Sequence, residues 1–122
     1  MKRILIVDDS STIRRAIRRI VESLGYGVEE AENGVCAIAA LRNSPAFDAV
    51  LCDIDMPVMD GLAFLQAVKD SRDITAPPII MCTTHTAFER IQSALSLGAS
   101  EYIMKPFDAD IISSKFEVCG IA

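Results

Sequence analysis

The feature that most restricts the fold is an alternation, repeated five times, between a short run suited to a β-strand and a longer helical pattern. The strand candidates are residues 4–7, 28–31, 49–52, 79–82 and 102–104. Most of these runs are almost wholly apolar, as in strands buried on both faces, and residues 28–31 carry the weakest signal. Strands that alternate with helices predict an α/β fold, a doubly wound parallel sheet with helices on both faces.

The first helical pattern is the clearest of the five. Apolar residues recur at three- and four-residue spacing from Ile13 to Leu24, which indicates an amphipathic helix. Ser10 or Ser11 can cap its start, and Gly25 or Gly27 can end it. Later helices are expected around residues 37–41, 62–68, 91–97 and 111–116.

Length and composition limit the class of protein. A chain of 122 residues fits one compact domain, so we expect residues 1–122 to form a single unit. The apolar runs are too short to cross a bilayer, and no signal peptide develops at the N-terminus, so we expect a cytoplasmic protein without a membrane partner. The net charge of −5 argues against broad nucleic-acid binding. The four cysteines lack the spacing of a zinc or redox motif and are expected to be buried or half-buried free thiols.

Polar residues follow the strong strand candidates at their carboxyl ends. They are Asp8 and Asp9, Asp53, Thr83 and Lys105. In an open parallel sheet, ligands bind beyond this edge. Carboxylates that converge there raise one another's pKa unless a cation joins them, and Mg²⁺ prefers a few carboxylate oxygens together with water and phosphate. The sequence therefore predicts a magnesium site at this edge.

The same residues suit phosphoryl transfer. Lys105 supplies a positive charge for a phosphoryl oxygen and Thr83 supplies a hydroxyl donor. An aspartate can itself act as the nucleophile and form an aspartyl phosphate. A single acid at a strand end is more often a helix cap, but acids, a threonine and a lysine that each follow their own strand are an improbable coincidence.

Four stretches carry a resemblance to a known family. They are ILIVDDSSTIRR, LCDIDMPVMDG, PIIMCTT and GASEYIMKPF, in this order over nearly the whole chain. In these stretches the sequence resembles the response-regulator receiver family, and within it the CheY-like stand-alone chemotaxis regulators. The resemblance implies a flavodoxin-like sheet of five strands in the order 2-1-3-4-5, five helices, and a receiver domain over residues 1–122. Since no linker follows the last helix, we expect a stand-alone receiver.

The resemblance implies a role for each acid. Asp53 is expected to accept a phosphoryl group from a phosphohistidine on a histidine kinase. Asp9 and Asp53 are expected to bind Mg²⁺ through their side chains and Asp55 through its backbone carbonyl, while Asp8 acts mainly through water.

It also implies how the domain signals. Lys105 is expected to pair with Asp53, Thr83 to hydrogen-bond the phosphoryl group, and Tyr102 to swing inward as Thr83 moves. The Lys105–Pro106 bond is expected to be cis. The surface of the fourth helix, fifth strand and fifth helix is expected to bind a downstream protein, such as a flagellar switch or another signalling component.

Other residues support weaker interpretations. The side chain of Asp55 is expected near the path of the water that attacks the phosphoryl group. His85, two residues after Thr83, either tunes hydrolysis or is a loop histidine without a role. The arginines of the first helix either form a solvated face with local ion pairs or dock an acidic partner; they are Arg14, Arg15, Arg18 and Arg19.

Three other functions compete with this interpretation. Asp53-Ile54-Asp55 has the DxD shape of haloacid dehalogenase-type phosphatases, but that group places DxD after its first strand. A flavodoxin-like cofactor binder needs amides facing a phosphate after the first strand, where this chain has DDSST. A receiver that signals without phosphorylation, as a scaffold, is disfavoured by the intact set of acids, Thr83 and Lys105.

Overall fold

A computed structural model describes residues 1–44, 47–84 and 88–121. One parallel sheet runs through it in the order β2-β1-β3-β4-β5. Its strands are β1 (Arg3–Val7), β2 (Gly27–Ala31), β3 (Ala49–Asp53), β4 (Ile79–Thr83) and β5 (Glu101–Met104). The α/β class and the strand order 2-1-3-4-5 expected from the sequence are confirmed.

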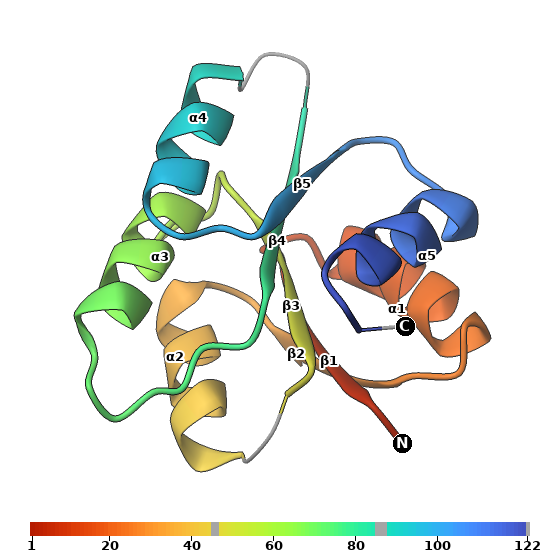
Figure 1. The fold of residues 1–122 in the computed structure, drawn as a ribbon, viewed down its shortest axis with the longest axis horizontal. Coiled ribbons are helices and arrows are strands. Elements are labelled where there is room, and N and C mark those ends of the chain that lie inside the picture. Colours follow the sequence, from red (N-terminus) through yellow and green to blue (C-terminus); the bar gives the residue numbers. More distant parts are fainter. Residues whose placement is uncertain (45–46, 85–87, 122) are drawn as a thin grey trace.

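Helices cover both faces of the sheet. They are α1 (Ser11–Ser23), α2 (Gly34–Asn43), α3 (Gly61–Asp70), α4 (Phe88–Ser96) and α5 (Ala109–Val118). Figure 1 shows α1 and α5 on one face and α2, α3 and α4 on the other. Among the described residues, none of the helices combines the length and apolar character that a membrane span requires.

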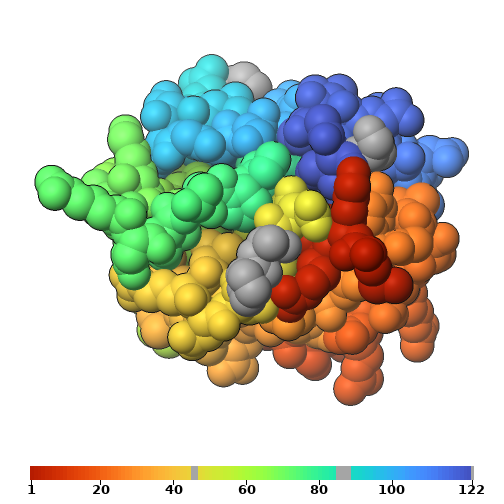
Figure 2. Space-filling model, turned by 60° about the horizontal axis from the view of Figure 1, so that its bottom comes forward, coloured from red at the N-terminus to blue at the C-terminus, as the bar shows by residue number. Residues whose placement is uncertain are grey.

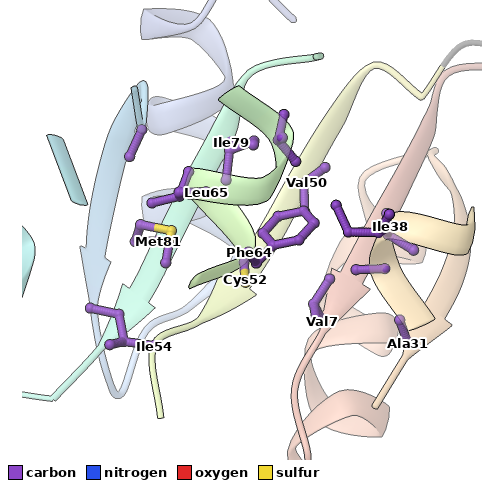
Figure 3. Close-up of a cluster of buried hydrophobic side chains, with 14 of the residues drawn as sticks. Val7, Ala31, Ile38, Val50, Cys52, Ile54, Phe64, Leu65, Ile79 and Met81 are labelled. Carbon is purple, nitrogen blue, oxygen red and sulfur yellow. The ribbon is translucent and has the colours of Figure 1, made fainter. Parts of the chain in front are cut away.

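The two faces of the sheet bury two separate hydrophobic clusters. Phe64 of α3 is the largest fully buried side chain in the cluster beneath α2, α3 and α4, where it lies beside Val50 and Cys52 of β3 (Figure 3). Phe116 of α5 holds the corresponding place beneath α1 and α5, edge-on to Tyr26 with 5.2 Å between ring centres. Full burial of such a ring is worth about 2–3 kcal/mol, so these packed layers hold the sheet rigid.

The start of α1 agrees with the sequence, but its apolar stripe is narrower than expected. Ser10 caps the helix by accepting a hydrogen bond from the Ile13 backbone N–H, and Gly25 after the helix has a φ of 95°. Ile13 and Ala16 are exposed. Because α1 begins beyond the carboxyl end of β1, its first turns extend past the sheet and have little to pack against.

Strand register decides which site residues become neighbours. Val7 pairs with Cys52, so Asp8 and Asp53 follow on adjacent strands. Asp53 in turn pairs with Cys82, one residue before Thr83, and Thr83 pairs with Met104, one residue before Lys105. All the strand-end residues therefore meet at one edge of the sheet.

The opposite edge of the sheet, where the strands begin, carries a larger hollow than the edge with the strand-end residues. Figure 2 views the molecule from that side, where the connection between α3 and β4, residues 71–78, projects from the surface (green). A hollow of about 590 Å³ lies there between α3 and α4, lined by apolar groups that include Leu65, Val68 and Leu97. It contains none of the strand-end acids, so size alone does not locate the chemistry.

Candidate functional site

Three carboxylates converge at the carboxyl edge of the sheet. Asp8, Asp9 and Asp53 each offer an oxygen atom, and these atoms lie within 4.8 Å of one another. Asp8 is buried, Asp53 is half-buried and Asp9 is exposed, so the group opens from the core toward solvent. Oxygen ligands in this arrangement suit a hard divalent ion such as Mg²⁺.

Lys105 lies between two of these acids. Its Nζ is 3.0 Å from Asp8 Oδ2 and 3.4 Å from Asp53 Oδ1. The expected pairing with Asp53 is therefore present, but the shorter contact is with Asp8, which sequence reasoning did not indicate. We call Asp8, Asp53 and Lys105 the inner cluster.

The backbone around β1 orients Asp8. Its Oδ1 accepts a hydrogen bond of 2.9 Å from the Ser10 backbone N–H, and its carbonyl oxygen accepts one of 2.7 Å from the Arg14 guanidinium. Since Lys105 occupies Oδ2, each oxygen of the Asp8 carboxylate already has a protein donor. Asp9 and Asp53 are therefore the better direct ligands, and the set of three acids fits the Mg²⁺ ion expected from the sequence.

Burial and neighbouring charges shift the pKa values of the inner cluster. Burial raises the pKa of Asp53, and the nearby Asp8 adds to this, while Lys105 acts in the opposite direction. For Lys105, burial works against the charged form, but attraction to Asp53 and the hydrogen bond to Asp8 outweigh it, so its pKa is raised. The lysine therefore stays charged, and a further cation is needed to offset the remaining negative charge.

Thr83 and Tyr102 lie on the neighbouring strands β4 and β5. Thr83 is buried at the end of β4, with its Oγ1 3.4 Å from the Thr84 carbonyl oxygen. Its own carbonyl accepts a 2.6 Å hydrogen bond from the Lys105 backbone N–H, and the Lys105–Pro106 bond is cis, as expected. Tyr102 is half-buried on β5 against the cluster beneath α4. The roles of both residues stay predictions.

A second ion cluster lies outside the first, and sequence reasoning missed it. Arg90 of α4 hydrogen-bonds to the Asp55 carboxylate, and its Nη2 lies 3.9 Å from Asp60 Oδ2. We call Asp55, Asp60 and Arg90 the outer cluster. With Asp9, Met56 and Pro57, these three residues line a shallow hollow of about 360 Å³. The only sequence signal was an arginine directly before the first core residue of α4, which is common on helix surfaces.

The connection between β3 and α3 brings these acids to the edge. Gly61 lies against the backbone of Asp53, since a Cβ there would come within 2.4 Å of the Asp53 carbonyl oxygen. The Gly61 N–H donates to the Ile54 carbonyl oxygen at 2.8 Å, which closes the turn. Val58, at its exposed tip, has a φ of 69°, a left-handed conformation that is unfavourable for a β-branched residue.

The arginines of α1 divide into two pairs. Arg14 and Arg18 both contact Glu30, at 3.0 and 2.6 Å, and the Arg18 hydrogen bond is the main reason that the pKa of Glu30 is lowered. Arg15 and Arg19 are exposed and have no ion pair within the described part of the chain. The local ion pairs are therefore present, and docking of an acidic partner stays a hypothesis. His85 lies outside the described residues.

The cysteines are free, but one differs from expectation. Cys52 and Cys82 are buried and Cys119 is half-buried, whereas Cys36 of α2 is exposed. Burial raises the pKa of Cys82 to about 12. Although Cys82 lies beside the inner cluster in the sheet, it carries no thiolate to compete with Asp53 as a nucleophile.

Comparisons with known proteins agree with this geometry. The family profile "Response regulator receiver domain" matches residues 4–117. The chain is 38% identical to "Chemotaxis protein CheY1" of Helicobacter pylori over 95% of this chain and 94% of that protein. It is 36% identical to "Chemotaxis protein CheY" of Pseudomonas aeruginosa over 94% and 93%. The solved structure of chemotaxis protein CheY4 of Vibrio cholerae superposes with a TM-score of 0.86 at 34% identity, over 96% and 97% of the two chains.

Proposed function

The chain belongs to the response regulator receiver family, and from this premise we propose that Asp53 accepts a phosphoryl group from a phosphohistidine of a partner histidine kinase. A receiver of two-component signalling is a phosphoacceptor rather than a conventional enzyme, which leaves the phosphatase alternative without support. The observation that carries the proposal is the inner cluster, where Lys105 lies within 3.4 Å of an Asp53 carboxylate that opens toward solvent beside Asp9. We take residues 1–122 as one receiver unit.

The transfer requires little covalent chemistry from the protein. A carboxylate oxygen of Asp53 attacks phosphorus, the P–N bond to the imidazole breaks, and its electron pair returns to the nitrogen, which takes up a proton. Lys105 offsets the negative charge on the phosphoryl oxygens, and the Thr83 hydroxyl donates a hydrogen bond to one of them. Hydrolysis later releases inorganic phosphate and restores the Asp53 carboxylate. Positioning and charge neutralisation are the main contributions in reactions of this kind.

Asp8, Asp9 and Asp53, with the backbone carbonyl of Asp55, would hold Mg²⁺. When bound, the ion neutralises charge on the acids and the phosphoryl oxygens. Asp9 and Asp53 supply the direct side-chain ligands, while Asp8 stays hydrogen-bonded to Lys105 and Ser10 and orders the site. Because Asp8 is buried, its 3.0 Å contact with Lys105 holds the lysine at the site.

Phosphorylation then changes protein binding. The added charge of about −1.5 to −2 attracts the Thr83 hydroxyl, and the space that Thr83 leaves allows Tyr102 to turn inward. Packing changes at α4, β5 and α5, and this face binds a downstream protein in the cytoplasm, with no nucleic acid or membrane involved directly. The names of the relatives favour a chemotaxis pathway, where a flagellar switch or another signalling protein would be the partner.

The test is incubation with a small acyl phosphate and Mg²⁺, followed by intact-mass analysis. We expect one added phosphoryl group, which hydroxylamine removes and which does not form without a divalent ion. Asp53→Asn should abolish the addition. Asp55→Asn is the matched control, because it makes the same chemical change two residues further on and should retain the addition. Wild-type labelling of Asp53→Asn would refute the assignment of the acceptor.

A further inference from the structure

The outer cluster connects α4 to the segment that follows the phosphoacceptor. Arg90 is on α4, whereas Asp55 and Asp60 belong to the connection between β3 and α3. Asp60 is also fixed at the start of α3, because its Oδ1 caps that helix by accepting a 2.8 Å hydrogen bond from the Ala63 N–H. The Arg90 guanidinium therefore joins α4 to residues that are continuous with Asp53.

The packing of α4 makes this connection important for its position. Within the described part of α4, the buried side chains are those of Ile91 and Ala94. The neighbouring α3 buries Phe64, Leu65 and Val68. A helix with fewer buried apolar groups has less energy holding it in one place, so a single polar contact contributes a larger share of its anchoring.

The position of Arg90 gives it a second available partner. It lines the same hollow as Asp9, and among the described residues around that hollow it is the one cation beside three acids. A phosphoryl group on Asp53 brings about two negative charges and three acceptor oxygens to this edge, whereas Asp55, which is exposed, and Asp60, which is half-buried, offer one charge each. The planar guanidinium binds phosphate oxygens in a bidentate manner, which favours the new partner.

We propose that Arg90 connects α4 to the site through ion pairs, and that its partners change on phosphorylation. Before phosphorylation it holds α4 to Asp55 and Asp60. After phosphorylation, which rests on the proposed function of Asp53, the guanidinium leaves these acids for the phosphoryl oxygens, and α4 is released from the connection between β3 and α3. This route to α4 operates in addition to Thr83 and Tyr102 and depends on residues that neither involves.

The first measurement follows the arginine side chain in the unmodified sequence. The ¹⁵N–¹H signal of the Arg90 Nε group, assigned by its loss in Arg90→Lys, is recorded before and after loading with acetyl phosphate and Mg²⁺. We expect it to shift on loading, while the Arg42 signal stays in place. Arg42 of α2 is the control, because it forms an exposed ion pair with Asp73, which lies in the connection between α3 and β4, away from the site.

The second measurement is a double-mutant cycle on the rate at which acetyl phosphate loads Asp53. We expect Arg90→Ala to slow loading about two- to fivefold, the range that an exposed ion pair supports, and Arg90→Lys to recover part of the rate. Asp55→Asn should speed loading in the wild-type background, because it frees Arg90, and should have little effect in Arg90→Ala. The Arg42→Ala and Asp73→Asn pair should leave the rate unchanged.

The outcomes separate the two proposals. If the wild-type chain is not loaded, or Asp53→Asn is loaded equally, the phosphoacceptor assignment is wrong. If loading is normal but the Arg90 signal does not move, or if the effects of Asp55→Asn and Arg90→Ala simply add, the exchange of partners is refuted and the phosphoacceptor assignment stands. Additive effects would mean that these residues act only through their separate charges.

Discussion

The inner and outer clusters have the same composition, one cation and two carboxylates, and lie at the same edge of the sheet, yet they differ in burial. In the inner cluster the side chains of Asp8, Asp53 and Lys105 are 1%, 15% and 17% exposed. In the outer cluster those of Asp55, Asp60 and Arg90 are 66%, 38% and 40% exposed. Water solvates and screens the outer charges, so their pairing contributes little energy and can rearrange.

Burial gives the inner cluster the opposite properties. Desolvation and the proximity of Asp8 raise the pKa of Asp53, and the two acids hold Lys105 in its charged form. The hydrogen bonds of the inner cluster keep the side chains of Asp8 and Asp53 in fixed positions. A buried cluster of charges suits chemistry that requires a preorganised site, and an exposed cluster suits a contact that must change partners.

The largest expected difference between the clusters is in the rate of phosphoryl transfer. Lys105→Met should slow loading by acetyl phosphate roughly 10²-fold, because it removes a preorganised charge from a site with little water. Arg90→Met, the same replacement of a cation in the outer cluster, should slow it only about two- to fivefold. Quench-flow loading followed by intact-mass analysis measures both rates. Similar losses in the two variants would show that burial does not set the difference.

Binding of Mg²⁺ should distinguish the clusters next. Thermal unfolding with and without a chelator should show stabilisation by Mg²⁺ of about 1.4 kcal/mol at a tenfold excess over the dissociation constant. Asp9→Asn should remove most of this gain. Asp60→Asn should retain it, since asparagine still caps α3 and the residue lies outside the group of three acids. An equal loss in both variants would place the ion between the clusters.

A smaller effect concerns stability without metal. Asp53→Asn should stabilise the chelated protein at pH 7 by about 1 kcal/mol, because it removes a buried charge, whereas Asp55→Asn should change stability by less than about 0.5 kcal/mol. The raised pKa of Asp53 means that its charge destabilises the folded state above that pKa. The stabilisation by Asp53→Asn should therefore shrink as the pH falls through the pKa of Asp53. Denaturant unfolding at pH 7 and pH 4 tests both the size and the sign.

The smallest expected effect is at Val58, between the two acids of the outer cluster. Val58→Asn should stabilise the protein by about 0.5–1 kcal/mol, because asparagine tolerates the left-handed conformation and the exposed valine loses little packing. Val58→Ala should gain less, since alanine also disfavours a positive φ. Loss of stability in Val58→Asn would show that the valine side chain has a partner that outweighs its backbone cost.

Sequence reasoning predicted the inner cluster because strand ends are readable. A short apolar run places its last residue at a known edge of a parallel sheet, so the sequence predicts that Asp8, Asp53 and Lys105 lie together. Local rules left Ser10 or Ser11 as the helix cap, and the structure places the cap at Ser10. Exposure of Ile13 was not predicted, because an apolar spacing does not reveal where the neighbouring layer ends.

The order of strands and helices, the polar residues at the strand ends and the turns between them are encoded in short stretches of this sequence, since periodicity and capping act over a few residues. Only the tertiary structure decided that Lys105 lies closer to Asp8 than to Asp53, and that Arg90 reaches Asp55 and Asp60. Lys105 and Asp8 are 97 positions apart in the sequence, and Arg90 and Asp55 are 35 positions apart. These contacts depend on strand register and on how α4 packs beside α3, which no local pattern specifies.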